Sequence, residues 1–261
     1  MNKTNISWTD YSWNPVSGCS KVSPGCQNCY ADALSRRWGR SFELTLHPEK
    51  LKEVKKIPRG SKVFVNSMSD LFHEKVPFEY IHEVMVAIKS RPDVIFQVLT
   101  KRPEVFDAYM MWFSRNYSDG HSYSIKLPDN LWLGVSVEMK TYIPRISTLQ
   151  FYKNSEQRIS KIFISFEPLL REVTPVNLHG VDWIIIGGES GPHHRPMKIE
   201  WARNLVKEAK AQGIPVWMKQ MGGLRPGGDL EDFPEDLRLR EFPVSPLEAY
   251  SGEATVGAMS K

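Results

Sequence analysis

The sequence predicts an α/β protein whose core is a full or partial (β/α) barrel of six to seven parallel strands. Short runs of β-branched and aromatic residues recur along the chain, and helical patterns follow most of them. Nearly continuous apolar strands that alternate with helices are typical of a parallel sheet whose outer face is covered. Six or seven such units fit into about 220 residues, which is the size of one barrel domain. On this pattern alone, a doubly wound sheet is the alternative.

Each predicted strand ends in polar or glycine residues. In chain order, the strands are expected near Tyr11–Asn14, Lys62–Asn66, Val94–Leu99, Leu131–Ser136, Lys161–Phe166, Trp183–Gly187 and Pro215–Lys219. The helices are expected at Tyr30–Trp38, Phe78–Ser90, Pro103–Ser114, Lys140–Gln150 and Ile199–Gln212. Pro77 and Pro103 lie where a first helical turn tolerates proline, and Gly213 lies where a helix tends to end.

Two segments depart from the alternation of strands and helices. Residues 114–130 are polar and rich in turn-forming types, which indicates an insertion. Residues 224–261 lose the alternation, so we expect a barrel domain over residues 1–223 and an extension over 224–261 that packs loosely and is partly disordered.

The composition excludes several classes of protein. Hydrophobic residues make up 41% and charged residues 25%, which excludes a mainly disordered chain, collagen and a coiled coil. The apolar run Trp183–Ile186 is far shorter than the roughly 20 residues of a membrane span. The N-terminus is polar where a signal peptide would be apolar, so a cytoplasmic protein without membrane contact is expected. The net charge of +4 permits a nucleic-acid partner without requiring one.

All three cysteines of the chain, Cys19, Cys26 and Cys29, fall within one eleven-residue window with C-x6-C-x2-C spacing. An odd number of clustered cysteines argues against a disulfide framework and indicates a shared metal centre. A 4Fe–4S cluster can accept three Cys ligands and leave one iron open, whereas structural zinc needs a fourth ligand from elsewhere in the chain. The spacing favours an iron–sulfur cluster over zinc. Three unliganded thiols are less favoured than either metal centre.

Several separated motifs resemble those of one family and occur in the same order along the chain. They are WTDYSWNPVSGCSKVSPGCQNCYA, NSMSDLFHE, LTKRP, GVSVE, SFEPLL and IIIGGESG, which together span roughly residues 6–223. The sequence resembles the phage Gp37/Gp68-like (DUF5131) family and, through the three-Cys loop after a first barrel strand, the radical S-adenosylmethionine (SAM) superfamily. The six residues between the first two cysteines differ from the three of the common radical SAM pattern. The resemblance implies a bacterial or phage-encoded enzyme with a 4Fe–4S cluster, SAM and an external electron donor.

Polar residues gather where the predicted strands end, which is where a (β/α) barrel places its chemistry. They include Asn66 to Asp70, Thr100 to Arg102, Ser136, Glu138, Glu167, Gly187 to Ser190, Lys219 and Gln220. The alternative is a purely structural role, in which these residues pair with one another, for example Arg102 with Glu167, and close the end of the barrel. Because SAM presents an amine, a carboxylate and a ribose, the predicted cofactor-binding residues are Lys101, Ser136, Glu138, Glu167, Gly187, Gly188 and Glu189.

Basic residues cluster at Arg36, Arg37 and Arg40 and again between Lys50 and Lys62. Such clusters usually form a solvated helix face, but with eight Trp residues they make nucleic acid a candidate substrate. The leading hypothesis is therefore an iron–sulfur enzyme that reductively cleaves SAM to start radical chemistry on an unknown, nucleic-acid-related substrate. The alternative is a binding protein, stabilised by an iron–sulfur or zinc site, without SAM chemistry.

Overall fold

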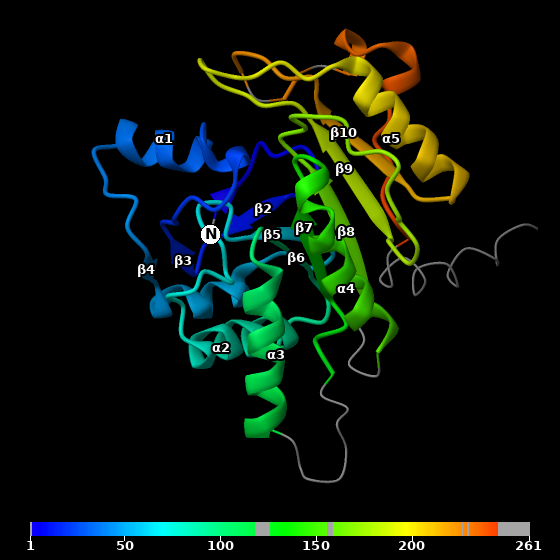
Figure 1. Ribbon diagram of the computed structural model, residues 1–261. Helices are drawn as coiled ribbons and strands as arrows, with labels where there is room; N and C mark the ends of the chain where they lie inside the picture. The colour runs from blue at the N-terminus through cyan, green and yellow to red at the C-terminus, as the bar shows by residue number, and fades with distance from the viewer. Residues whose placement is uncertain (1, 118–125, 156–158, 226, 229, 245–261) are drawn as a thin grey trace, which may run out of the picture.

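The computed structural model describes residues 2–117, 126–155, 159–225, 227–228 and 230–244, and its centre is one eight-stranded sheet (Figure 1). The strands follow one another in the sheet as they do in the chain: β1 (Asn2–Lys3), β2 (Tyr11–Trp13), β5 (Lys62–Val65), β6 (Ile95–Thr100), β7 (Leu131–Ser136), β8 (Lys161–Phe166), β9 (Trp183–Gly187) and β10 (Val216–Gln220). A separate antiparallel pair joins β3 (Val16–Ser17) to β4 (Thr45–Leu46).

Within the described part of the eight-stranded sheet, all neighbours from β2 to β10 are parallel, and only β1 pairs antiparallel, with β2. The α/β class with a mostly parallel sheet is therefore confirmed, with one strand more than predicted. Closure into a full barrel is not confirmed, because among the described residues no hydrogen-bonded ladder joins β10 to β1 or β2.

In the part of the chain that the structure describes, five α-helices connect or flank the strands: α1 (Tyr30–Arg37), α2 (Phe78–Lys89), α3 (Pro103–Tyr117), α4 (Pro144–Asn154) and α5 (Ile199–Ala211). The expected helix Lys140–Gln150 is divided into the 3-10 turn η3 (Lys140–Tyr142) and α4, because Pro144 is suited to the first turn of a helix. The nine-residue 3-10 helix η2 (Pro48–Lys56) was not predicted. No described helix combines the length and apolarity that a bilayer crossing requires.

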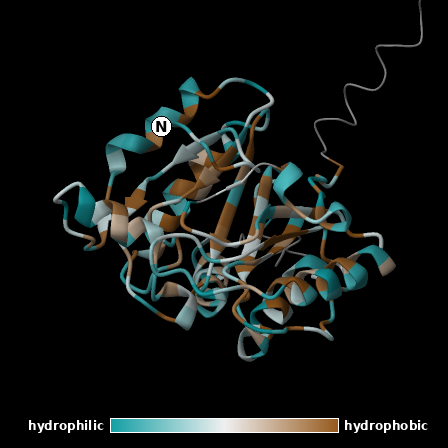
Figure 2. Cartoon of the chain, turned by 90° about the horizontal axis from the view of Figure 1, so that it is seen from above, coloured by the Kyte–Doolittle hydropathy of each residue, from teal (hydrophilic) through white to brown (hydrophobic). Residues whose placement is uncertain are grey.

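The two faces of the sheet carry different cores, because successive residues of a strand point to opposite faces. On the outer face, residues such as Val63, Val98 and Ile164 join the large cluster beneath the helices. On the inner face, Phe64, Trp132, Phe163, Trp183 and Trp217 form a second, mainly aromatic cluster. Figure 2 shows the hydrophobic strands at the centre and hydrophilic residues on the surrounding helices.

The described part of segment 224–261 packs more closely than expected. Phe233 and Leu237, around the short turns η4 (Leu230–Asp232) and η5 (Glu235–Leu237), are buried. The Trp183 indole donates to the Glu241 carbonyl at 2.8 Å, and Phe242 packs against the same indole. The segment therefore closes the amino end of the inner cluster. Residues 245–261, like residues 118–125 of the predicted insertion, lie outside the described residues.

Gln97 is a polar exception within the sheet. It is fully buried, and within the described ranges neither atom of its amide has a hydrogen-bond partner. Since a buried polar group without a partner costs about 1–3 kcal/mol, Gln97→Leu is expected to raise the free energy of unfolding by roughly that amount in urea titrations. Asn130→Leu is the control, because the Asn130 amide donates to the carbonyls of Ile88, Arg91 and Val94 and its loss should destabilise the protein. A Gln97→Leu protein less stable than wild type would contradict this prediction.

Candidate functional site

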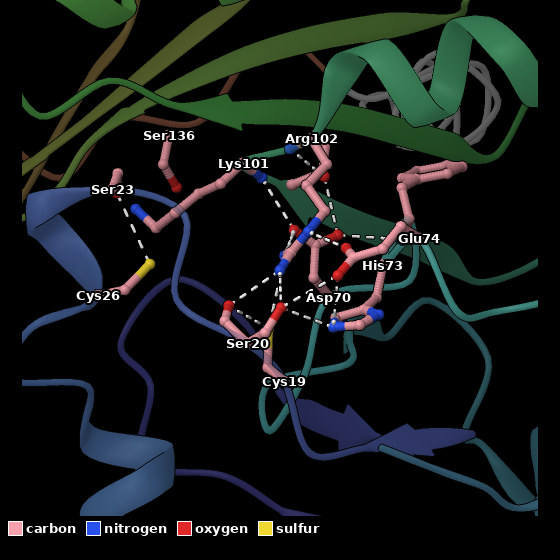
Figure 3. A network of polar contacts seen from close by, with 12 residues as sticks. Cys19, Ser20, Ser23, Cys26, Asp70, His73, Glu74, Lys101, Arg102 and Ser136 are labelled. Atoms are coloured by element: carbon pink, nitrogen blue, oxygen red, sulfur yellow. Dashed lines mark hydrogen bonds and ion pairs between the residues drawn. The ribbon is translucent and has the colours of Figure 1, made fainter. Parts of the chain in front are cut away.

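The three cysteines lie on the loop that follows β3. Figure 3 shows two of them, Cys19 and Cys26, close to side chains that follow the parallel strands β5 and β6. Cys26 ends the 3-10 turn η1 (Pro24–Cys26), and the Cys29 carbonyl accepts the Ala33 N–H in the first turn of α1. All three are free thiols of intermediate burial. We call residues 19–29 the cysteine loop.

Arg102, which follows β6, fixes the first part of the cysteine loop. Its side chain is almost completely buried and donates to the Ser20 carbonyl at 2.9 Å and to the Cys19 Sγ at 3.5 Å. Nη1, which donates to Cys19, also contacts the Asp70 carboxylate at 3.2 Å, and Nε contacts the Glu74 carboxylate at 3.0 Å. Arg102 thus places a permanent positive charge beside Cys19, where it would stabilise a thiolate.

The Cys19 thiol is protonated at neutral pH in this environment. Burial, followed by the nearby Asp70 carboxylate, raises the pKa of Cys19 to about 11 despite the opposing effect of Arg102. Because a metal binds the thiolate, ligation at Cys19 would release a proton.

Glu138, which follows β7, fixes the middle of the cysteine loop. Its carboxylate is fully buried and accepts the Ser23 hydroxyl at 2.6 Å, with Lys101 Nζ at 2.5 Å and Arg145 Nη1 at 3.0 Å. Burial alone would raise the pKa of Glu138, but these cations and the hydroxyl together hold it below its usual value. Contact with the loop is so close that a side-chain carbon at Gly25 would lie 2.5 Å from a Glu138 oxygen.

Glu189, which follows β9, fixes the last part of the cysteine loop. Its carboxylate accepts the Asn28 amide at 2.9 Å and three N–H groups of Arg195. Arg195 also donates to the Pro24 carbonyl at 2.9 Å. Although burial opposes it, hydrogen bonds from Arg195 and Asn28 lower the pKa of Glu189. Three charged side chains at three different strand ends therefore bind successive parts of one loop.

The other predicted site residues lie at the same edge. Glu167 forms an ion pair with Lys219 at 2.5 Å, in which both side chains keep almost a fifth of their surface exposed. A side-chain carbon at Gly187 would lie 3.4 Å from Glu167, and one at Gly188 would lie 2.5 Å from the Met221 carbonyl oxygen. In Figure 3 the Ser136 side chain points toward Lys101 and the cysteine loop. The suggested pairing of Arg102 with Glu167 is wrong: Arg102 pairs with Asp70 and Glu74.

Six side chains that hold the cysteine loop in place were not predicted as site residues: Ser23, Asn28, His73, Glu74, Arg145 and Arg195. Arg145 lies in α4 and Arg195 follows a His-His pair, and both patterns look like ordinary solvated surface. The sequence held one indication of their roles: Arg145 lies seven residues after Glu138, and Arg195 lies six residues after Glu189.

The donor set suits an iron–sulfur cluster in kind and number, since three reduced thiols share one loop. The sulfurs are not gathered around one point, however: within the described residues, no three His, Cys, Asp or Glu side chains are grouped so that they could hold a metal ion. Figure 3 shows Cys19 beside Arg102 and His73, whereas Cys26 lies beside Ser23. Joint ligation therefore requires the cysteine loop to draw its thiols together.

Glu138→Gln is expected to lower the free energy of unfolding by about 1.5–3 kcal/mol, the value of hydrogen bonds to a charged group. The amide would face Lys101 and Arg145 without a negative charge to offset them. Urea titration measures the loss, and Asp129→Asn is the control, since its ion pair with Lys126 is exposed. Equal stability of the two variants would show that Glu138 does not anchor the loop.

No curated protein matches the sequence. Among solved structures, spore photoproduct lyase complexed with dinucleoside spore photoproduct is similar at a TM-score of 0.47 and 11% identity, over 80% of this chain and 63% of that one. A mutant of that lyase with bound AdoMet and dinucleoside spore photoproduct gives a TM-score of 0.46 at 11% identity over the same shares. The chain thus spans less than two thirds of these proteins.

The family is shown by the sequence itself. Residues 3–244, almost the whole described chain, match the family described as "Protein of unknown function (DUF5131)". The motifs that indicated this family lie in the cysteine loop and at the strand ends that surround it. The chain therefore belongs to the DUF5131 family.

Proposed function

We propose that this protein is a radical-SAM-type iron–sulfur enzyme in which Cys19, Cys26 and Cys29 hold a 4Fe–4S cluster. One observation carries the proposal: three free thiols share a loop that buried charges fix to the carboxyl edge of a parallel sheet. When bound, the cluster supplies the electron that cleaves SAM reductively, and an external donor restores that electron. The substrate class is open, with a nucleic-acid-related molecule as our first candidate.

The residues of the site divide into two roles. Lys101, Glu138 and Glu189 act on the cysteine loop, because their charged groups bond with it or with each other. Ser136, Glu167, Gly187 and Gly188 are the direct SAM contacts that we propose. The Glu167–Lys219 pair keeps exposed surface and presents both signs of charge, which suits the amine and carboxylate of the methionine part of SAM.

Glu167→Gln is expected to weaken SAM binding about 10- to 150-fold, which corresponds to the loss of one ionic hydrogen bond. Because the Glu167–Lys219 pair is only partly buried, the urea midpoint should stay close to that of the wild type. Isothermal titration of SAM into the reconstituted protein measures the affinity, with the exposed Asp236→Asn variant as control. Wild-type SAM affinity in Glu167→Gln would remove Glu167 from the binding site.

The proposal is tested by anaerobic reconstitution with iron and sulfide, followed by metal and sulfide analysis. A radical-SAM-type protein should be brown and hold roughly four iron and four sulfide per chain. A colourless protein with one zinc would overturn the proposal.

A second function is supported by the density of bonds around the cysteine loop. Arg102, Glu138 and Glu189 all bind it, so the bound metal could serve only to fold that loop in a binding protein without SAM chemistry. This alternative predicts the same loss of metal from cysteine variants but no response of the metal centre to SAM.

A further inference from the structure

A large aromatic side chain is exposed at the end of α1. Trp38 keeps 55% of its surface accessible, and it stands between basic residues in the sequence Arg36-Arg37-Trp38-Gly39-Arg40. We call residues 36–40 the basic–aromatic turn. Exposure of one apolar side chain is common, so the case for a binding surface depends on how this turn is built.

The backbone of the basic–aromatic turn is fixed by hydrogen bonds. The Arg40 N–H donates to the Ser35 carbonyl at 2.9 Å and the Gly39 N–H donates to the Arg36 carbonyl at 3.0 Å. Gly39 has a φ of +63°, and these two bonds around a left-handed glycine form a Schellman cap. The cap turns the chain back so that the Arg40 guanidinium lies 5.7 Å from the centroid of the Trp38 ring. Trp38 and Arg40 are thus held side by side.

The turn has an unbalanced positive charge. Arg36 pairs with Asp32 one helical turn earlier at 2.8 Å. Arg37 and Arg40 are exposed and have no carboxylate partner within the described residues. Positive side chains near the C-terminus of a helix interact favourably with the helix dipole, which accounts for arginines at this position. The dipole does not account for an exposed indole beside the Arg40 guanidinium.

The basic–aromatic turn is also connected to the candidate site. α1 begins directly after Cys29, and its eight residues span about 12 Å. Tyr30 in its first turn is 45% exposed and lies seven residues before Arg37, so both are on one face of the helix. In Figure 1, α1 stands apart from α2 and α3 on the side of the molecule that carries the cysteine loop. A ligand strand on this face would lead toward the cysteine loop.

We propose that the basic–aromatic turn binds single-stranded nucleic acid, with one base stacked on Trp38 and backbone phosphates on Arg37 and Arg40. An exposed aromatic ring flanked by unpaired cations is the arrangement that binds single strands without sequence preference. A duplex keeps its base faces stacked internally and cannot use the indole. This inference does not depend on a metal at the cysteine loop, so it can fail or hold independently of the proposed function.

The test is fluorescence anisotropy of labelled oligothymidylate and oligouridylate of about 20 nucleotides, titrated with the full chain. Trp38→Ala is expected to weaken binding at least tenfold. Arg37→Gln/Arg40→Gln should weaken binding and reduce the slope of log affinity against log salt by about 1.4, or 0.7 per phosphate contact. Comparison of the two oligonucleotides distinguishes DNA from RNA as the source of the ligand.

Two matched controls distinguish binding at the basic–aromatic turn from a general effect of positive charge or of exposed aromatic surface. Lys55→Gln/Lys56→Gln removes the same charge from η2, and Phe151→Ala removes a 66% exposed aromatic from α4. Both should bind like wild type. The proposal is overturned if wild type binds neither oligonucleotide, if the lysine pair matters as much as the arginine pair, or if a duplex competes equally well. It is also overturned if Trp38→Ala changes only self-association in sedimentation velocity, since the indole would then face a second copy.

Discussion

Replacement of Cys19, Cys26 or Cys29 by alanine, one at a time, is expected to abolish incorporation of iron. In the proposed site each thiolate would supply one of three protein attachments to the cluster, and no other cysteine exists in the chain to replace it. A cluster held at two points would be lost during purification. Iron and sulfide content and visible absorbance after anaerobic reconstitution measure the effect.

Val22→Ala is the matched control for the cysteine variants, because Val22 lies on the same loop and is 41% exposed. It should retain wild-type iron. Full iron content in any one of the cysteine variants would show that the assignment of three ligands is wrong.

Arg102→Met is expected to lower the free energy of unfolding by about 3–5 kcal/mol, the largest stability effect that the structure predicts. The substitution leaves the buried Asp70 carboxylate without its cation and frees the Ser20 carbonyl. Asp70 would still accept the Thr100 hydroxyl and the Lys101 N–H, which argues for the lower part of the range. The urea unfolding curve measures the loss.

Arg203→Met is the matched control for Arg102→Met. Arg203 also forms an ion pair, with Asp236 at 2.7 Å, but about half of each side chain is exposed. Exposed pairs contribute less than about 1 kcal/mol. If the two arginine variants lose similar stability, Arg102 does not fix the cysteine loop as the geometry indicates.

The fold was largely predictable because local patterns determine its central strands. The bounds of β7, β8 and β9 agree with the prediction, since each is an apolar run of five or six residues between turn signals. The two-residue strands β1, β3 and β4 were missed, because two residues carry no periodicity and their pairing depends on tertiary contacts. Barrel closure likewise depends on whether the two edge strands of the sheet pair with each other. The sequence of a single strand does not show this.

The gathering of the candidate site residues at one edge of the sheet was predictable, but the bonds among them were not. Parallel strands bring their ends to one edge, so Lys101, Glu138 and Glu189 could be placed together from the order of elements. The bonds of Glu138 and Glu189 to the cysteine loop could not be foreseen, because the partners lie far apart in the chain. Ser23 and Glu138 are separated by 115 residues, and Pro24 and Arg195 by 171. No local pattern records such a pairing.

The most direct test of a SAM-binding iron–sulfur site is electron paramagnetic resonance of the reconstituted, reduced protein before and after addition of SAM. In the proposed cluster, the iron without a cysteine ligand would be open to an exogenous ligand. We therefore expect a cluster signal whose g-values shift when SAM is added and stay fixed when adenosine, which lacks the amine and carboxylate of methionine, is added instead. A cluster signal that is identical with and without SAM would contradict the proposed function and favour a binding protein whose metal only folds the cysteine loop.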